Sequence, residues 1–204
     1  MNPIQESPPR IGRPRSEAAS SHAAIMDAVH ELLQEKSVRE LSMEQVAKRA
    51  GVSKPTLYKW WPSKGALILA MFHERMSGRL AAPEATSAEE SIRRAVRHLV
   101  AEFNGLFGKV MAELIAEGQA DSASLRELYD SHIKLRRVAT VTVIEKGKLS
   151  GEFSSDTDPE LLVDAIFGPL YYRLLLRLMP LSPQYGDELV DQVLRGCRPA
   201  AAGR

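Results

Sequence analysis

Residues 53–64, SKPTLYKWWPSK, carry side chains that could contact a nucleic acid. Lysine can donate hydrogen bonds to guanine or phosphate, threonine offers a hydroxyl to phosphate and a methyl to thymine, and tyrosine reaches backbone oxygens. If the segment is helical, Leu57 and Trp61 lie one turn apart and pack inward with Val52. The outer face then presents Lys54, Thr56, Tyr58 and Lys59 to DNA, with Pro55 available for apolar contact with a base methyl.

Two short helices must hold this surface in place. Ser42 and Gln45 fit a capping box that opens the first helix, and the apolar face of that helix stops at Gly51. Ser53 is the expected N-cap of the second helix, which runs to about residue 60. Because glycine permits a tight turn between them, the pattern predicts a helix-turn-helix whose second helix projects into a major groove.

The rest of the chain has apolar residues at spacings of three and four, typical of amphipathic helices, and no convincing alternating strand. We therefore predict an all-α fold of about nine helices. They cover approximately residues 20–36, 42–50, 53–60, 63–80, 92–103, 111–115, 125–146, 159–179 and 183–195. The domains expected are a flexible basic arm (1–19), a helix-turn-helix DNA-binding domain (20–66), a helical body (67–198) and a tail (199–204).

Positive charge is concentrated toward the N-terminal end. Residues 1–80 contain 12 Lys and Arg and 8 Asp and Glu, a net charge of +4, whereas the remainder contains 15 and 18, a net charge of −3. A basic head on a slightly acidic body is typical of a DNA-binding protein, although a net charge of this size is weak support by itself.

No stretch of the sequence predicts a membrane span, because the most apolar one, residues 166–179, contains Pro169, Arg173 and Arg177. The N-terminal residues lack the apolar segment of a secretory signal, and a single cysteine, Cys197, excludes an intrachain disulfide. These features predict a cytoplasmic protein that does not contact a membrane.

No set of residues predicts catalysis or a bound metal. The five histidines show neither i,i+4 pairing nor an adjacent cysteine, which are the usual spacings of metal ligands. The sequence also lacks a recognisable nucleophile with its base, a phosphate-binding glycine loop and a spaced pair of catalytic carboxylates. We expect neither an enzyme, nor a metal, nor a cofactor.

Residues 53–64 closely resemble the recognition-helix signature of the tetracycline-repressor (TetR) family of bacterial regulators. The similarity extends over residues 25–72, with family-like spacing of Ile25, Ala28, Leu41, Val46, Ala47, Gly51, Val52, Leu57, Tyr58, Lys64 and Leu67. Members of this family are Ω-shaped helical dimers: three helices bind DNA, a fourth leads into a six-helix body, and the last two form a four-helix bundle in the dimer. The resemblance implies a DNA-binding transcription regulator, commonly a repressor that a small molecule releases from a palindromic double-stranded operator.

The resemblance also implies specific DNA contacts. It places Lys54, Pro55, Thr56 and Lys59 next to the bases, and Ser42, Tyr58, Trp60 and Lys64 at the DNA backbone, with Ser53 at the N-cap between them. Ser42 and Lys64 also lie near helix N-termini, where free N–H groups and the helix dipole favour phosphate. Arg13 and Arg15 are similar to a basic extension that some members insert into the minor groove, but a merely solvated arm is equally compatible with the sequence.

The resemblance makes residues 67–198 an effector-binding and dimerisation domain, and residues 167–174 are similar to a segment that begins the dimer-forming helices in one large subgroup. The expected dimer interface comprises Gly168, Tyr172, Leu174, Leu175, Leu178, Val190, Val193 and Leu194. The candidate effector pocket comprises Phe103, Phe107, Met111, Leu114, Tyr129, His132 and Tyr171. Ordinary core packing explains each pocket residue individually, and the effector itself is unknown.

Two alternatives to a repressor stay open. A helical protein-interaction module could use its basic head to dock an acidic partner, which a comparison of salt-dependent binding to duplex DNA and to protein would separate. A ligand-dependent activator is also compatible, because no residue distinguishes blocking RNA polymerase from recruiting it.

Overall fold

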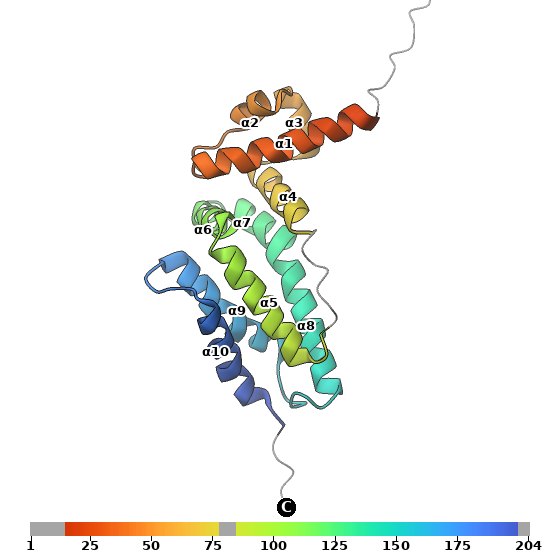
Figure 1. Cartoon of the computed structure of the whole chain (residues 1–204), viewed down its shortest axis with the longest axis vertical. Coiled ribbons are helices and arrows are strands. Elements are labelled where there is room, and N and C mark those ends of the chain that lie inside the picture. Colours follow the sequence, from red (N-terminus) through yellow and green to blue (C-terminus); the bar gives the residue numbers. More distant parts are fainter. Residues whose placement is uncertain (1–14, 78–84, 200–204) are drawn as a thin grey trace, which may run out of the picture.

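The computed structural model describes residues 15–77 and 85–199, and every regular element in these ranges is helical (Figure 1). The α-helices are α1 Arg15–Glu35, α2 Met43–Ala50, α3 Lys54–Trp60, α4 Lys64–Ser77, α5 Ala88–Phe103, α6 Leu106–Gly118, α7 Ser122–Leu128, α8 Lys134–Leu149, α9 Pro159–Leu176 and α10 Pro183–Leu194. A π-helical segment, Tyr129–Ile133, lies between α7 and α8, and a 3-10 turn, Arg195–Cys197, follows α10. The all-α prediction is confirmed, and none of these helices is long and apolar enough to cross a membrane.

Helices α1, α2 and α3 form a small head at one end of the molecule (Figure 1). Leu33, Val46 and Leu57, one from each of these helices, are completely buried. At the surface, the Arg49 guanidinium on α2 binds two carboxylates of α1, Glu31 at 3.1 Å and Glu35 at 3.0 Å. The apolar core supplies most of the stability, and the forked arginine adds a polar contact between α2 and α1 at the surface.

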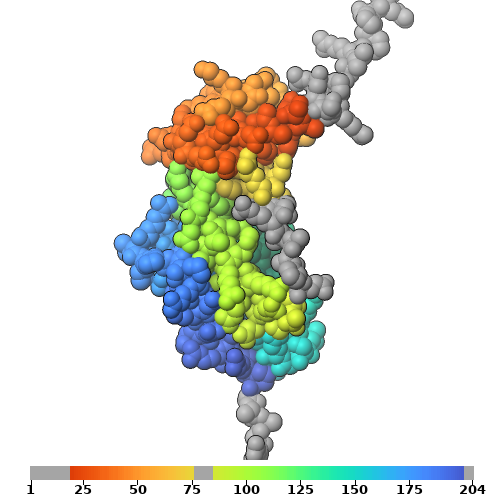
Figure 2. Space-filling model, viewed as in Figure 1, coloured from red at the N-terminus to blue at the C-terminus, as the bar shows by residue number. Residues whose placement is uncertain are grey.

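Helix α4 leads from the head into the body, and its apolar residues are buried around most of its circumference. Leu67, Ile68, Met71 and Phe72 all lie in the core because α4 packs against α1 on one side and α7 on the other. In Figure 2 the head, in red and orange, is stacked on the longer body, with the yellow α4 between them. Movement of α4 therefore repacks both parts.

The body is organised around α5, which packs against α6, α8, α9 and α10. Helix α10 sits very close to α5: a Cβ at Gly186 would lie 3.1 Å from a methyl group of Val96. Two ion pairs join the same helices, with Arg97 2.7 Å from Asp187 and Arg93 2.6 Å from Asp191. The inner face of α10 is therefore packed against α5 of its own chain.

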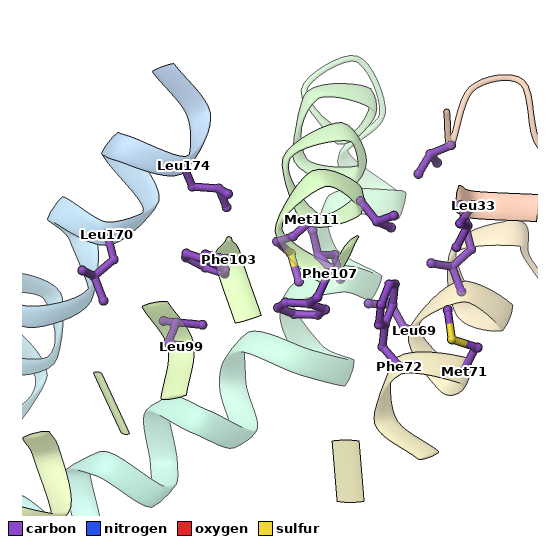
Figure 3. Packing of buried hydrophobic residues seen from close by; sticks show 14 of the residues in the cluster. Leu33, Leu69, Met71, Phe72, Leu99, Phe103, Phe107, Met111, Leu170 and Leu174 are labelled. Atoms are coloured by element: carbon purple, nitrogen blue, oxygen red, sulfur yellow. The ribbon is translucent and has the colours of Figure 1, made fainter. Parts of the chain in front are cut away.

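One hydrophobic core runs through the whole molecule from head to body. Figure 3 shows it passing from Leu33 through Phe72 of α4 to Phe107 of α6 and Phe103 of α5. The Phe72 and Phe107 rings meet edge to face with centroids 5.1 Å apart, and Phe103 stacks on Phe107 at 6.2 Å. Because packed cores rearrange in discrete steps, a change in the body can reach α4 and the head through these contacts.

The structure corrects two helix boundaries in the body. The helix expected for residues 125–146 is divided into α7, the π-helical segment and α8, and α7 begins earlier because the Asp121 side chain caps it by accepting from Ala123 N. Helix α6 is much longer than residues 111–115. It begins directly after Gly105, and it lies so close to α5 that a Cβ at Gly108 would stand 1.9 Å from the Phe103 carbonyl oxygen.

Candidate DNA-binding surface and effector interior

The helix-turn-helix has the local geometry that its residues predict. Ser42 and Gln45 make the complete capping box of α2, and Gly51 ends that helix with a left-handed φ of 66°. Ser53 caps α3, its hydroxyl accepting from Thr56 N at 3.3 Å. Leu57 and Trp61 are both buried, as the spacing of four indicates. The position of α3 is therefore fixed by its inner face and by a cap at its start.

The outer face of α3 is accessible over most of its length. Lys54, Pro55, Tyr58, Lys59 and Trp60 are exposed, and Thr56 is half-buried with its hydroxyl 2.7 Å from that of Ser53. Two large aromatic side chains, Tyr58 and Trp60, are 48% and 58% exposed and lie beside lysines in the sequence. Aromatic and cationic groups together fit a polyanion with stacked bases.

Not every predicted DNA contact is free of partners within the chain. Lys54 forms an ion pair with Glu44 of α2, and the hydrogen bond that its ammonium donates to this carboxylate raises the pKa of the lysine. Lys59 has no ion-pair or hydrogen-bond partner among the described side chains. Arg13 lies outside the described residues, and Arg15 is the first residue of α1, with a side chain that is not described. Among these cations, only Lys59 could bind a phosphate without giving up a described partner.

Lys64 lies at the junction of head and body. Its ammonium donates to the Val38 carbonyl oxygen at 2.6 Å and stands 3.6 Å from the Glu117 carboxylate of α6. Lys64 therefore connects the turn after α1 to α6 in this structure, and a phosphate contact would require it to leave at least one of these groups.

Two further residues of α6 hold the end of α1. Lys109 Nζ donates to the carbonyl oxygens of Leu33 at 3.3 Å and Lys36 at 3.1 Å, which are otherwise left open where the helix ends. Glu113 accepts from Val38 N at 2.6 Å. Because Lys109, Glu113 and Glu117 are four residues apart, they form one charged stripe on α6 that attaches the head to the body. The sequence did not reveal this stripe, since the partners of Lys109 and Glu113 are backbone atoms more than 70 residues away.

The residues predicted to line an effector pocket do not all lie in one site. Phe103, Phe107 and Met111 are buried in the continuous core (Figure 3). Tyr171 joins them, with its ring centroid 5.1 Å from that of Phe103. Tyr129 is instead 41% exposed, because the helix face that carries Leu128 and His132 turns inward. The pocket prediction for Tyr129 is therefore not supported by its position.

A cavity of about 140 Å³ lies between α4, α6 and α7. Leu114 is the one predicted pocket residue that lines it, together with Ser63, Lys64, Glu117 and Leu128. The cavity thus adjoins the Lys64–Glu117 contact between head and body.

Sequence reasoning missed a polar cluster beside the aromatic core. Glu102, whose side chain is only 8% exposed, lies 3.2 Å from the Arg136 guanidinium and 2.7 Å from the His98 ring nitrogen. His132 packs its ring against Phe107 with centroids 5.1 Å apart. Burial, followed by the charges of Arg136 and His73, lowers the pKa of His132 to about 4. His132 was predicted to line the pocket, but Glu102 and Arg136 were not. Their four-residue spacings from His98 and His132 become informative once these faces are known to point inward.

The lowered pKa of His132 predicts a pH-dependent stability. Between pH 6.5 and 4 the unfolded chain binds a proton that the folded protein does not, so stability is retained above pH 6.5 and falls as the pH decreases. We expect the free energy of unfolding to drop by about 2 kcal/mol more in the wild type than in His132→Phe between pH 7.5 and 5. Urea denaturation at the two pH values measures this difference, and an equal drop in both proteins would remove His132 as its source.

The predicted dimer interface separates into an outer and an inner set. On α9, Gly168, Tyr172 and Leu175 form an exposed stripe, with the last two 55% and 43% exposed, and Leu178 follows in the exposed turn. Val193 of α10 is half-buried.

Leu174, Val190 and Leu194 require a correction. They are only 6%, 0% and 2% exposed because α9 and α10 turn these side chains toward their own body. These three residues support the outer stripe from behind and do not present surface to a second chain.

The fold and the α3 surface define a helix-turn-helix DNA-binding protein with a helical regulatory body. The profile of the bacterial regulatory proteins of the tetR family matches residues 25–71, and that of the tetracyclin repressor-like C-terminal domain matches residues 82–193. The uncharacterized HTH-type transcriptional regulator YdeS of Bacillus subtilis (strain 168) is 34% identical over 191 residues, covering 94% of this chain and 96% of its own. The HTH-type transcriptional regulator EthR of Mycolicibacterium smegmatis (strain ATCC 700084 / mc(2)155) is 31% identical over 158 residues, covering 74% of this chain and 70% of its own.

Solved structures agree with these matches. The crystal structure of the TetR family transcription regulator SCO0332 superimposes with a TM-score of 0.73 at 31% identity, covering 88% of this chain and 100% of that one. This chain therefore belongs to the TetR family, and it is a DNA-binding transcription regulator.

Proposed function

We propose that this regulator is a homodimeric repressor that binds a palindromic operator and is released from it by a small molecule bound in the body. The observation that carries the proposal is the exposed face of α3, where Lys59 and Tyr58 stand on a helix anchored by the buried Leu57. In such a dimer two recognition helices would enter successive major grooves about 34 Å apart. We propose no catalytic activity, and we place the protein with its operator in the cytoplasm.

The route from effector to DNA is part of the proposal. An effector that prefers one arrangement of the body would shift the packing of Phe107 against Phe72, and with it α4 and the head. The charged stripe of Lys109 and Glu113 on α6 would carry the same movement to the end of α1. Couplings of this kind commonly amount to about 1 to 3 kcal/mol, which corresponds to a 5- to 150-fold change in operator affinity.

Selection of bound duplexes from a random DNA pool tests the proposal. We expect the wild-type protein to enrich a palindrome, Lys54→Ala to lose preference at one base pair of each half-site, and Tyr58→Ala to weaken all sequences alike. A uniform loss for Lys54→Ala would move Lys54 to the DNA backbone. Failure to enrich any sequence, with only salt-sensitive background binding, would favour a protein-interaction module instead.

A further inference from the structure

Two nitrogen atoms in the interior of the body are buried without a hydrogen-bond partner. They are Nη1 of Arg136 on α8 and Nε2 of His132 in the π-helical segment, four residues before it. A buried polar group left unpaired costs about 1 to 3 kcal/mol, and a charged donor costs more. Unpaired groups of this kind in a folded protein call for a ligand or an ordered water that satisfies them.

The charges around these two atoms favour an anion. One oxygen of the Glu102 carboxylate accepts from Arg136 Nη2, whereas the other makes no hydrogen bond and lies 2.7 Å from His98 Nε2 as an ion-pair contact only. The charged groups that act on His132 are Arg136 and His73, both of which disfavour its protonation, and no carboxylate opposes them. An anionic oxygen would accept from Arg136 and from the N–H of a neutral imidazole, and such charge-assisted hydrogen bonds are the stronger kind.

The surroundings of the two nitrogens are apolar and aromatic. The His132 ring faces Phe107, which continues through Phe103 to Tyr171. The 140 Å³ cavity is not lined by Arg136, His132, Phe103 or Phe107 themselves, but it is lined by Leu114, seven residues after Phe107 on α6, and by Leu128, four residues before His132. A π-helical turn marks this position, and such turns are frequent at functional sites because they allow a helix to shift register.

We propose that the effector is an apolar carboxylic acid whose carboxylate is bound by Arg136 and His132 and whose hydrocarbon body packs against Phe103 and Phe107. This inference rests on the proposed function only in taking the bound molecule to be the effector. The acid is recognised by the unpaired donors, and its body wedges between α6 and the π-helical segment, next to the Lys64–Glu117 contact that joins the body to the head.

Matched probes with different head groups test the chemistry. The acids are 4-phenylbutyrate and decanoate, and their partners are 4-phenylbutan-1-ol, 4-phenylbutylamine and 1-decanol. We expect each acid to raise the melting temperature of the full-length protein and to bind about 10- to 100-fold more tightly than its alcohol or amine. Equal binding of acid and alcohol, or no shift with either acid at 5 mM, would overturn the proposal.

Two variants assign the effect to the named residues. Arg136→Met removes the charged donor while filling similar volume, and we expect it to abolish the preference for acids. His132→Phe keeps a ring against Phe107, and we expect it to reduce the preference about 3- to 10-fold. An undiminished acid preference in a folded Arg136→Met protein would refute the assignment, and His132→Phe gives the same answer if Arg136→Met fails to fold.

Operator release, measured with the enriched duplex, separates the two proposals. Acid binding without release would support the recognition chemistry and reject this site as the effector site. Release by the alcohols as well as by the acids would support an effector in the body and reject recognition of a carboxylate.

Discussion

Leu175→Asp should convert the protein from a dimer to a monomer and lower operator affinity by about 100-fold or more. Leu175 lies with Tyr172 and Gly168 on the exposed stripe of α9, at spacings of three and four residues. In a two-fold dimer the substitution places two carboxylates in the centre of one apolar interface, where an unpaired charge is poorly tolerated. In the dimer, binding of one recognition helix holds the second at a high effective concentration near the DNA. This linkage commonly raises affinity by a factor of 10² to 10⁴, and the monomer loses it.

Sedimentation velocity measures the oligomeric state, and fluorescence anisotropy with the selected duplex measures the affinity. Leu149→Asp is the matched control, because Leu149 is 88% exposed at the end of α8 and lies off the stripe. We expect this control to stay dimeric and to bind DNA normally. If Leu175→Asp sediments as a dimer at micromolar concentration, the exposed face of α9 is not the interface.

Lys59→Glu should reduce affinity for every duplex by about 100-fold at 0.1 M salt. In each head the substitution replaces an attraction to phosphate by a repulsion. A dimer has two heads, so the loss occurs twice. Lys146→Glu makes the same change in net charge in the last turn of α8, and α8 extends away from the head in Figure 1. A similar loss in both variants would show a general effect of net charge and would remove Lys59 from the contact surface.

The salt dependence of the wild type shows how many lysines reach the DNA. If Lys54, Lys59, Lys64 and one arm arginine of each protomer neutralise phosphates, log K falls with log salt at a slope of about −7. Lys54 and Lys64 are paired within the chain, to Glu44 and Glu117. If those pairs persist on DNA, the slope is only about −4. A slope shallower than about −3 would contradict the whole set of contacts.

The structure of the head could be predicted from the sequence because it depends on interactions between residues close together in the chain. The capping box of Ser42 and Gln45, the turn at Gly51 and the buried pair Leu57 and Trp61 each involve residues at most four positions apart. Their geometry follows from helix periodicity and backbone conformation, so the sequence determined both the helix-turn-helix and the face of α3 that turns outward.

The tertiary structure decided the features that depend on distant residues. Lys64 was expected at the DNA backbone, but the Val38 carbonyl and Glu117 bind it at the junction. Leu174 and Leu175 are neighbours with the same side chain, yet one is buried and the other exposed, which the position of the body alone determines. Likewise, Arg136 and His132 became a candidate anion site only when α5 and α6 brought Glu102 and Phe107 against them. Helix propensity and periodicity depend on residues within one or two turns of the chain. Burial and ion pairing depend on which helices pack together, and the pattern of residues along the chain does not encode that packing directly.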